Sequence, residues 1–497
     1  MVSKVLSSSY IGIESYILEI EADIMAGLPS FNIVGLADVA ISESRERVRA
    51  AIKNSGYELP ARRVVINMSP AGIRKEGASF DLPIAIGILS SLGEVGNKNL
   101  GKYIILGELS LNGNIRKISG AINSVICAKE NGIEGIILPR ENYLEANMIK
   151  GIEIIPVEDL TQVVEFLNDN ITIEPPKVEE IKIDDEYLID FKEVKGQIQA
   201  KRCIEIAAAG GHNFYMIGTP GAGKSMLAKR LPTILPPMSD EEIIESTKIY
   251  SSAGMLTKDM PIVSKRPFRS PHHSSSMVSL VGGGRTPKAG EISLAHNGVL
   301  FLDEVTEFPR LVLETLRQPL EDKKVSITRA EYRVEMPADM ILIMASNPCP
   351  CGNLFENKCT CSISQIQRYQ HKISGPLLDR IDLYLEIKKL TKEELASFEE
   401  GESSAIIRER IKKARQKQFE RFGDYKVNGN MTPKDIKKYC KLDEESKKIL
   451  IDSIDIFGLS GRSYDKVLKV GRTIADLEGS ENIELEHIME ALSYRKK

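Results

Sequence analysis

The stretch Gly218-Thr219-Pro220-Gly221-Ala222-Gly223-Lys224-Ser225 decides the fold of this chain, because it matches the complete G-x-x-x-x-G-K-[ST] phosphate-binding pattern. Residues 213–217 before it are typical of a buried strand, and residues 226–230 after it are typical of a helix, which is the context that the motif requires. The alternative is a glycine-rich turn before an ordinary helix. The glycines allow a tight turn in which backbone N–H groups converge on anionic oxygens. The stretch therefore predicts an ATP site, in which Lys224 binds the β- and γ-phosphates and the Ser225 hydroxyl binds Mg²⁺.

Two further apolar runs end in polar side chains that suit such a site. Residues 298–302 predict a strand buried in a parallel sheet, and this strand ends in Asp303 and Glu304. Beside a phosphate loop, Asp303 would hold Mg²⁺ directly or through water, and Glu304 would polarise the attacking water. An acidic turn at a strand end is the alternative. Residues 340–345 predict another buried strand, after which Asn347 is placed to hydrogen-bond the γ-phosphate or the attacking water.

Four of the seven cysteines lie in one short stretch, as Cys349-Pro350-Cys351 and Cys359-Thr360-Cys361. The C-x-C…C-x-C spacing brings four thiolates within reach of one tetrahedral Zn²⁺. Free or redox-active thiols beside the ATP site are the alternative. The odd number of cysteines and their clustering favour a reducing compartment over a framework of disulfides.

The whole chain of 497 residues is long enough for about three domains. Residues 1–170 mix short strands with helices and predict an α+β domain, and the charged, proline-containing residues 171–188 predict a linker. Residues 189–390 predict an α/β core whose parallel sheet carries the phosphate loop, and residues 391–497 predict a helical lid.

Composition and charge exclude several classes of protein. No apolar run reaches eighteen residues and no secretory leader begins the chain, so we expect a cytoplasmic protein without membrane contact. A formal net charge of −4 excludes a globally basic coat for nucleic acid. A local basic channel is compatible with that charge.

Two arginines in the C-terminal half occupy positions typical of AAA+ ATPases. Arg380, within Leu377-Leu378-Asp379-Arg380-Ile381-Asp382, lies where these ATPases present an arginine finger to the nucleotide of a neighbouring subunit. Such fingers contribute ~10³–10⁵ in rate. Arg462, at the start of a predicted helix, matches the second sensor arginine, which touches the γ-phosphate, and Asn347 matches the polar sensor of the same class. A lone arginine is more often an ordinary surface residue.

The N-terminal third resembles the proteolytic domain of Lon-type proteases at Lys75-Glu76-Gly77-Ala78-Ser79-Phe80-Asp81 and at residues 107–113. Ser79 falls where that family has its nucleophile. A Ser–Lys enzyme also needs a lysine to accept the hydroxyl proton. The resemblance places that residue at Ile122, and Lys117 lies a turn away. We therefore expect a Lon-like fold kept for structure or partner contacts, with peptidase activity as the alternative.

The phosphate loop, the acidic strand end, Asn347, Arg380 and Arg462 occur in AAA+ order, beside a Lon-like domain and a cysteine cluster. This combination resembles the magnesium-chelatase-like AAA+ ATPases of the ComM/YifB family over nearly the whole chain. Its more specific strings include Asn347-Pro348-Cys349-Pro350-Cys351-Gly352 and Arg269-Ser270-Pro271-His272-His273. The resemblance implies a bacterial, cytoplasmic homo-hexamer promoted by nucleotide. It further implies an ATP-driven motor for branch migration or unwinding of DNA in recombination and natural transformation, with recombination proteins as partners.

Residues 323–328 and 332–335 alternate like two strands, and residues 329–331 between them complete a predicted hairpin. It resembles the pre-sensor hairpin that replicative MCM helicases point into their channel, with Arg329 at its tip. Lys323, Lys324, Arg329 and Arg333 would then contact the phosphates of single-stranded or branched DNA with a salt-dependent grip. A solvated hairpin without a ligand is the alternative.

A chelatase-type motor is another class of protein that would contain the same phosphate loop. A chelatase-type motor subunit would use ATP to help insert magnesium into a porphyrin, but the long Lon-like extension and the cysteine cluster argue against it. The neighbouring His272 and His273 could bind a metal, although two adjacent residues on a loop rarely form a site alone. We expect them to belong to a polar insertion that contacts a threaded substrate.

Overall fold

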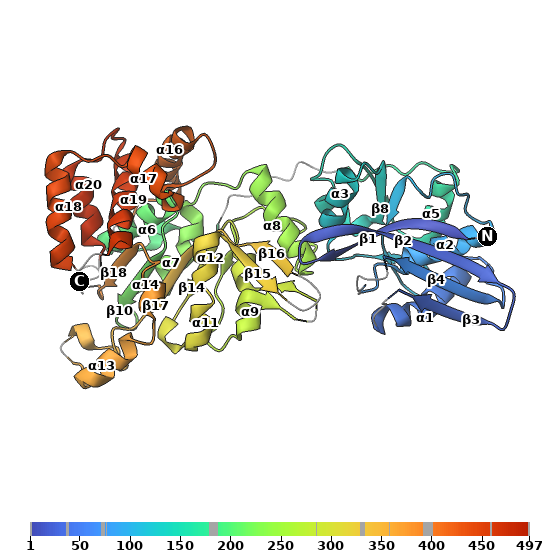
Figure 1. Cartoon of the computed structure of the whole chain (residues 1–497), viewed down its shortest axis with the longest axis horizontal. Helices are drawn as coiled ribbons and strands as arrows, with labels where there is room; N and C mark the ends of the chain where they lie inside the picture. The colour runs from blue at the N-terminus through green and yellow to red at the C-terminus, as the bar shows by residue number, and fades with distance from the viewer. Residues whose placement is uncertain are drawn as a thin grey trace. The chain divides into compact units, whose positions relative to one another are not determined.

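The computed structural model describes residues 2–35, 39–70, 75, 77–177, 187–284, 286–328, 333–356, 358–390, 401–457 and 460–495. The chain divides into two compact units (Figure 1). The first comprises Met1–Ile183, Asp240–Val263 and Thr286–Lys288, and the second comprises Asp184–Ser239, Ser264–Arg285 and Ala289–Lys497. Residues 178–186 of the predicted linker lie outside the described residues. In the described part of the chain, no helix is long and apolar enough to cross a membrane.

The first unit is built on a seven-stranded mixed sheet with the order β3-β4-β2-β1-β5-β8-β9. β2 pairs antiparallel with β1 and β4, whereas β3–β4 and the run β1–β5–β8–β9 are parallel. The strands are β1 (Ser3–Ile11), β2 (Glu14–Met25), β3 (Ser30–Val34), β4 (Arg63–Ser69), β5 (Tyr103–Ile105), β8 (Gly135–Pro139) and β9 (Glu153–Val157), and β6 (Glu108–Leu109) pairs with β7 (Ile115–Arg116).

Helices of the first unit pack on this sheet and complete the α+β fold that the sequence predicts. They are α1 (Val39–Asn54), α2 (Asp81–Leu92), α3 (Ala121–Glu130), α4 (Tyr143–Ala146) and α5 (Leu160–Leu167). The middle of α2 is apolar on all sides, and residues 81–89 are buried against β1 and β2. A helix that is hydrophobic all round is expected in a core rather than at a surface.

A segment that follows the phosphate-loop helix in sequence folds with the first unit. This segment, Asp240–Val263, contains α8 (Asp240–Ser252), which packs on α3. Ser251 Oγ donates a hydrogen bond to the buried carboxylate of Glu145 and accepts one from the backbone N–H of Gly120. Burial raises the pKa of Glu145 above its usual value. Polar contacts as well as apolar packing therefore hold α8 in this unit.

The second unit carries the phosphate loop on a five-stranded parallel sheet with the order β11-β14-β17-β10-β18. The strands are β10 (Phe214–Gly218), β11 (Phe268–Arg269), β14 (Val299–Leu302), β17 (Ile341–Ser346) and β18 (Leu383–Ile387). Every residue of β14 and β17 is buried, as continuous apolar runs predict for strands that are covered on both faces. The helices that accompany the sheet are α6 (Ile198–Gly210), α7 (Lys224–Ile234), α9 (Met277–Val281), α10 (Glu291–Leu294), α11 (Arg310–Glu314), α12 (Arg317–Asp322), α13 (Ile363–Gln370) and α14 (Gly375–Leu378).

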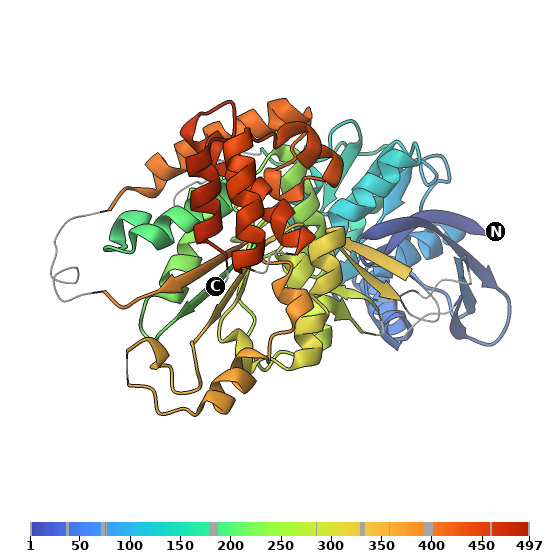
Figure 2. The same ribbon diagram turned by 60° about the vertical axis from the view of Figure 1, so that its left-hand side comes forward.

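The described C-terminal part of the second unit, residues 401–457 and 460–495, is helical, as the sequence predicts. Its helices are α16 (Ser404–Phe422), α17 (Pro433–Tyr439), α18 (Glu444–Phe457), α19 (Gly461–Glu478) and α20 (Leu485–Ser493). Thr432 caps α17 by accepting a hydrogen bond from the N–H of Asp435. Figure 2 shows the segment that carries α13 standing out from the sheet, away from these helices.

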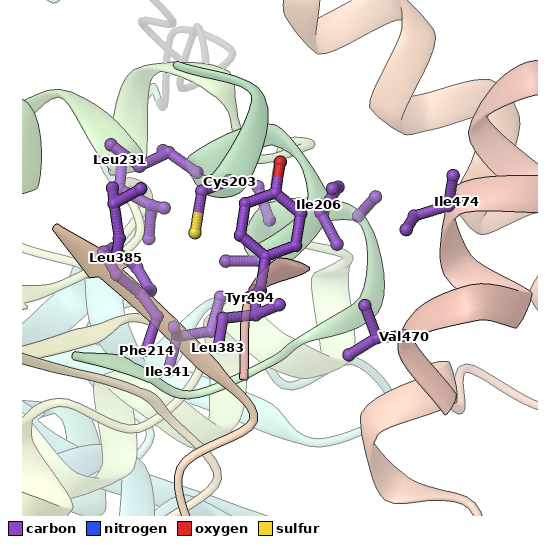
Figure 3. Packing of buried hydrophobic residues seen from close by; sticks show 14 of the residues in the cluster. Cys203, Ile206, Phe214, Leu231, Ile341, Leu383, Leu385, Val470, Ile474 and Tyr494 are labelled. Carbon is purple, nitrogen blue, oxygen red and sulfur yellow. The ribbon is translucent and has the colours of Figure 1, made fainter. Parts of the chain in front are cut away.

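The core of the second unit joins the sheet to this helical bundle (Figure 3). Phe214 of β10 and Leu383 of β18 pack under Cys203 of α6, and Val470 and Ile474 of α19 approach α6 from the bundle side. All five side chains are almost completely buried. The bundle and the sheet therefore share one apolar core, so the described lid helices belong to the same compact unit as the phosphate loop.

A two-stranded hairpin lies between α12 and β17 in the chain of the second unit. β15 (Lys324–Thr328) pairs antiparallel with β16 (Arg333–Pro337), which confirms the hairpin predicted from alternating residues. Val325, Ile327, Val334 and Met336 are buried on one face, and polar side chains occupy the other. Its expected turn at residues 329–331, including Arg329 at the tip, lies outside the described residues, as does residue 332.

Candidate active site

The phosphate loop connects the end of β10 at Gly218 to the start of α7 at Lys224. Gly221 and Gly223 have φ values of 77° and 90°, in the left-handed region that favours glycine. The backbone can therefore turn tightly at the N-terminus of an eleven-residue helix. This arrangement aims N–H groups and the positive end of α7 at the place where phosphate oxygens bind.

Lys224 is buried, with 8% of its surface exposed, and lies over the loop that precedes it. Its Nζ donates hydrogen bonds to the carbonyl oxygens of Gly218 (2.7 Å) and Thr219 (3.1 Å) and to Oδ1 of Asn347 (3.3 Å). Burial lowers the pKa of Lys224, and the charges of Asp303 and Glu304 oppose this shift. The structure thus brings together Lys224, the first residue of α7, and Asn347, the residue after β17.

Ser225 and Asp303 meet at the same edge of the sheet. Ser225 Oγ donates a 2.6 Å hydrogen bond to Asp303 Oδ2, and the Glu304 N–H donates to Asp303 Oδ1. A hydroxyl and a carboxylate are oxygen ligands of the kind that Mg²⁺ prefers. The donor set therefore fits the ion that the sequence predicts at these two residues.

Glu304 differs from the other acidic residue because its side chain is exposed. It begins the turn after β14 with φ 49°, and its Oε2 lies 3.5 Å from Nδ1 of His273. The ring of His272 stacks on that of His273, with centroids 4.0 Å apart. The contact between Glu304 and His273 was not predicted, and the only signal for it was a pair of histidines in a polar loop.

Arg380 lies at the opposite end of the sheet from the phosphate loop of its own chain. β18 and β10 are parallel, with Leu383 opposite Phe214 and Ile387 opposite Gly218. The loop follows Gly218, whereas Arg380 precedes Leu383, so this ladder alone separates them by roughly 13 Å. Arg380 forms an ion pair with Glu321, with Nη2 2.5 Å from Oε1, and donates through Nε to the Arg317 carbonyl oxygen. The structure does not bring Arg380 to the residues that surround Lys224.

Arg462 lies with Arg380 rather than with the phosphate loop. It is exposed in the first turn of α19, and both arginines line one cavity of about 620 Å³. Between them, Lys466 of α19 donates hydrogen bonds to the carbonyl oxygens of Asp379 and Ile381, and its Nζ lies 3.4 Å from Oδ1 of Asp382. The two predicted arginines therefore share a face of the second unit, and a lysine that was not predicted links their elements.

The described basic residues of the hairpin each have an acidic neighbour. Lys324 Nζ lies 2.6 Å and Arg333 Nη2 3.2 Å from carboxylate oxygens of Glu335, and Lys323 Nζ lies 3.0 Å from Asp339 Oδ1. The hydrogen bond from Lys324 lowers the pKa of Glu335. The positive charge that the sequence predicts on this hairpin is therefore partly balanced within the chain.

The four clustered cysteines lie just after Asn347, and their sulfur atoms are all within 4.8 Å of one another. Sγ of Cys349 lies 3.4 Å from that of Cys351 and 3.7 Å from that of Cys359, and the sulfurs of Cys351 and Cys359 are 3.7 Å apart. Thiolates 2.3 Å from a tetrahedral zinc stand about 3.8 Å apart. Among the described residues, these cysteines form the only group of three or more potential metal ligands, and His272 and His273 belong to none.

The residues of the predicted peptidase site do not form a Ser–Lys pair in the first unit. Ile122 is completely buried in the core around α3. Lys117 donates from Nζ to the carbonyl oxygen of Leu256, in the segment after α8. Close to Ser79, the buried Asp81 forms an ion pair with Arg47 at 2.7 Å. The residue at the family's lysine position is thus a buried isoleucine, and Lys117, its neighbour in sequence, has a carbonyl oxygen as its partner.

A phosphate loop in a β11-β14-β17-β10-β18 parallel sheet, with carboxylates after β14, Asn347 after β17 and a helical C-terminal part, defines an ATPase of the AAA+ class. The chain is 40% identical to competence protein ComM of Haemophilus influenzae over 498 residues, which cover 99% of this chain and 97% of that protein. It is 42% identical to YifB of Salmonella typhimurium over 488 residues, or 98% and 95% of the two chains. The chain therefore belongs to the ComM/YifB family of magnesium-chelatase-like AAA+ ATPases.

Family models match three consecutive parts of the chain. Magnesium chelatase, subunit ChlI, matches residues 190–395, subunit ChlI of Mg-chelatase matches residues 20–142, and the ChlI C-terminal model matches residues 401–495. Lon protease 2 of Bacillus subtilis is 31% identical over 177 residues, which is 32% of this chain and 31% of that protein. The similarity to Lon-type proteases is thus limited to part of the chain.

Proposed function

We propose that this chain is an ATP-driven motor that acts on DNA and promotes branch migration or unwinding during recombination in natural transformation. Similarity to competence protein ComM along almost the whole of both chains supports this function. The proposed division of labour assigns the motor to residues 189–390, the lid to residues 391–497 and a structural or partner-binding role to residues 1–170. We place the protein in the cytoplasm, where ATP and DNA are both available.

The location of Arg380 is the observation that carries the proposal of a ring. An arginine finger must reach the transferred phosphate. Arg380 stands at the far end of the β10–β18 ladder from its own phosphate loop, so the nucleotide that it serves is the one bound by a neighbouring subunit. Arg462, on the same cavity, serves the same neighbour. A repeated head-to-tail contact forms a ring when its rotation closes, and we propose a homo-hexamer of this kind that nucleotide promotes.

Within each site, the residues near the loop divide the chemistry between them. Lys224 binds the β- and γ-phosphates, and Ser225 and Asp303 hold Mg²⁺, which would neutralise charge on the phosphate oxygens. Glu304 accepts a proton from, and orients, the water that attacks the γ-phosphate. Asn347, already within hydrogen-bond distance of Lys224, holds the γ-phosphate or the water in line.

The hairpin of β15 and β16 is the proposed DNA contact. Lys323, Lys324 and Arg333 supply the cations of its described part, and Arg329 completes the set at the tip. DNA phosphates would compete with Glu335 for Lys324 and Arg333, whose ion pairs with it are exposed and therefore weak. Six such hairpins around a ring would grip single-stranded or branched DNA in a salt-dependent way.

Zinc is the proposed occupant of the cysteine cluster. The separations of 3.4 to 3.7 Å among the sulfur atoms of Cys349, Cys351 and Cys359 suit thiolates around one tetrahedral ion. Metal analysis of the reduced, purified protein should give one zinc per chain. Substitution of all four cysteines by serine should remove it, and a wild-type protein without zinc would contradict the proposal.

ATPase and branch-migration assays test the DNA function directly. We expect single-stranded or branched DNA to stimulate ATP hydrolysis, and we expect the wild type, but not Glu304→Gln, to move the branch point of a labelled four-stranded substrate. Recombination proteins can then be added to find those that raise the rate. An ATPase indifferent to every DNA structure would contradict the proposal and would favour the chelatase-type motor, which a porphyrin metal-insertion assay tests.

A further inference from the structure

We propose that the described residues 349–356 and 358–370, named here the cysteine arm, position the three segments of the ATP site, so that metal binding by the cysteines of the arm sets ATP affinity and turnover. This inference rests on the proposed zinc binding. The arm begins two residues after Asn347 and includes α13. It contacts the phosphate loop, the chain after Glu304 and the chain after Asn347, each through a different residue.

The first contact joins the arm to the phosphate loop. Gly352, between Cys351 and α13, packs directly against the ring of Pro220, and a Cβ at residue 352 would stand 2.7 Å from Cδ of that ring. Gly352 also has φ 79°, which side chains rarely tolerate. Only glycine therefore allows the turn of the cysteine cluster to approach the loop so closely.

The second contact joins the arm to the turn that carries Glu304. Thr306 Oγ1 donates a 2.6 Å hydrogen bond to the hydroxyl of Tyr369, and both side chains are buried. Thr306 is two residues beyond Glu304. A buried hydrogen bond fixes the backbone on that side of the carboxylate, and its loss leaves buried polar atoms unsatisfied. Tyr369 is therefore a positioning residue for the hydrolytic step.

The third contact joins the arm back to the end of β17. Gln370 Nε2 donates a 3.3 Å hydrogen bond to the carbonyl oxygen of Pro348, the residue after Asn347. The arm begins just after β17, and the hydrogen bond of Gln370 to Pro348 brings its last residue back beside its first. A metal ion shared by the pair Cys349 and Cys351 and the pair Cys359 and Cys361 would close a shorter loop within the arm and reduce its conformational freedom.

The arm has little apolar core of its own to hold this shape. Cys349 and Tyr369 are buried, whereas Phe355 is 40% and Ile363 76% exposed. Small structures without a sufficient core use a metal or disulfides in its place. Coordination of zinc by the four cysteines would thus be the main interaction that holds the arm together. It would fix the positions of Gly352 and Tyr369 relative to the sheet.

Zinc removal tests the inference with a readout that does not depend on turnover. Full-length protein is treated with a chelator under reducing conditions, its zinc content is measured, and its affinity for a fluorescent, non-hydrolysable ATP analogue is titrated before and after zinc is restored. We expect affinity to fall roughly tenfold and to recover. Zinc that is present and removable without any change in affinity would overturn the inference but leave the zinc site intact. Absence of zinc from the untreated protein would overturn both.

Two variants outside the ligand set separate positioning from metal binding. Tyr369→Phe should keep its zinc and its ATP affinity but lose several-fold in kcat, because it alters only the segment after Glu304. Gly352→Ala should keep zinc but weaken ATP binding, because the new Cβ displaces Pro220. Gln367→Ala, an exposed neighbour on α13, is the matched control and should equal the wild type in all three measurements. Wild-type kcat in Tyr369→Phe together with wild-type affinity in Gly352→Ala would refute the positioning role.

Discussion

Lys224 and Glu304 have contrasting surroundings, although both lie beside the phosphate loop. Lys224 is buried and hydrogen-bonded to two loop carbonyls and to Asn347, whereas the side chain of Glu304 is 58% exposed and touches His273. A buried cation held by the loop is suited to binding phosphate. An exposed carboxylate at a strand end is accessible to water. Substitutions at the two residues should therefore separate binding from hydrolysis.

We expect Lys224→Ala to abolish measurable ATP binding and Glu304→Gln to keep it while kcat falls by about 10²–10⁴, the contribution of a positioned general base. Nucleotide titration and phosphate release measure the two quantities. Glu307→Gln, an exposed acid three residues further along, controls for the loss of charge and should behave as the wild type. Hydrolysis by Glu304→Gln at the wild-type rate would assign activation of the water to another group.

Residue patterns predicted the strand ends well but could not predict contacts between distant loops. The apolar runs located β10, β14 and β17, and Ser225 and Asp303 meet at 2.6 Å because parallel strands end at one edge. The bonds of Thr306 with Tyr369 and of Lys466 with the Asp379 carbonyl oxygen join segments far apart in the sequence. No periodicity records such pairs, since each depends on the completed fold.

At the scale of elements, Asp382 connects β18 to helix α19 and to the loop before β10. Its carboxylate lies 3.4 Å from Lys466 Nζ and 3.5 Å from His212 Nδ1 and accepts a hydrogen bond from the N–H of Asn213. Burial raises the pKa of Asp382, but the charge of Lys466 and a hydrogen bond from His212 outweigh it and hold the pKa well below its usual value. The ionised form therefore stabilises the folded state.

The lowered pKa of Asp382 makes the stability of the folded protein depend on pH. A carboxyl with a lowered folded-state pKa contributes stability above its unfolded pKa, near 4, and loses it as the pH falls through the folded-state pKa. We expect Asp382→Asn to cost roughly 3 kcal/mol of unfolding free energy at neutral pH, because it leaves Lys466 buried beside a neutral group. In thermal unfolding from pH 8 to pH 3, the difference in unfolding free energy between wild type and variant should stay constant down to about pH 4 and become smaller below that pH. A difference in unfolding free energy that becomes larger in acid would contradict this account.

The hairpin offers a second test at this scale. Glu335 pairs with both Lys324 and Arg333, so Glu335→Gln should release two cations for DNA phosphates. We expect DNA affinity to rise several-fold at low salt, and Lys324→Glu to lower it, with the larger effects at low ionic strength. Salt-dependent binding isotherms measure both, and Glu158→Gln, which breaks an exposed ion pair with Arg140 in the first unit, is the control. Unchanged affinity in both hairpin variants would remove the hairpin from the DNA contact.

At the scale of the whole molecule, the chain combines a Lon-like α+β unit with an AAA+ unit of the ComM/YifB family. The sequence predicted both folds, because the loop motif and strand patterns are local. The grouping of Asp240–Val263 with the first unit could not be predicted, since α8 follows the phosphate-loop helix in sequence and has an ordinary helical pattern. The place of Arg380 and Arg462 on one cavity also needed the fold. That placement underlies the proposal that each ATP site is shared between two subunits.

The most direct test of that claim is the ATPase activity of mixtures of Lys224→Ala and Arg380→Ala subunits. Each variant alone should be almost inactive, the first because it does not bind ATP and the second because it lacks the finger. In an equal mixture, about a quarter of the interfaces of a head-to-tail ring should combine an intact loop with an intact Arg380. We predict that activity returns in the mixture and is greatest near equal proportions. Activity that stays at the level of the separate variants in every mixture would contradict the shared site.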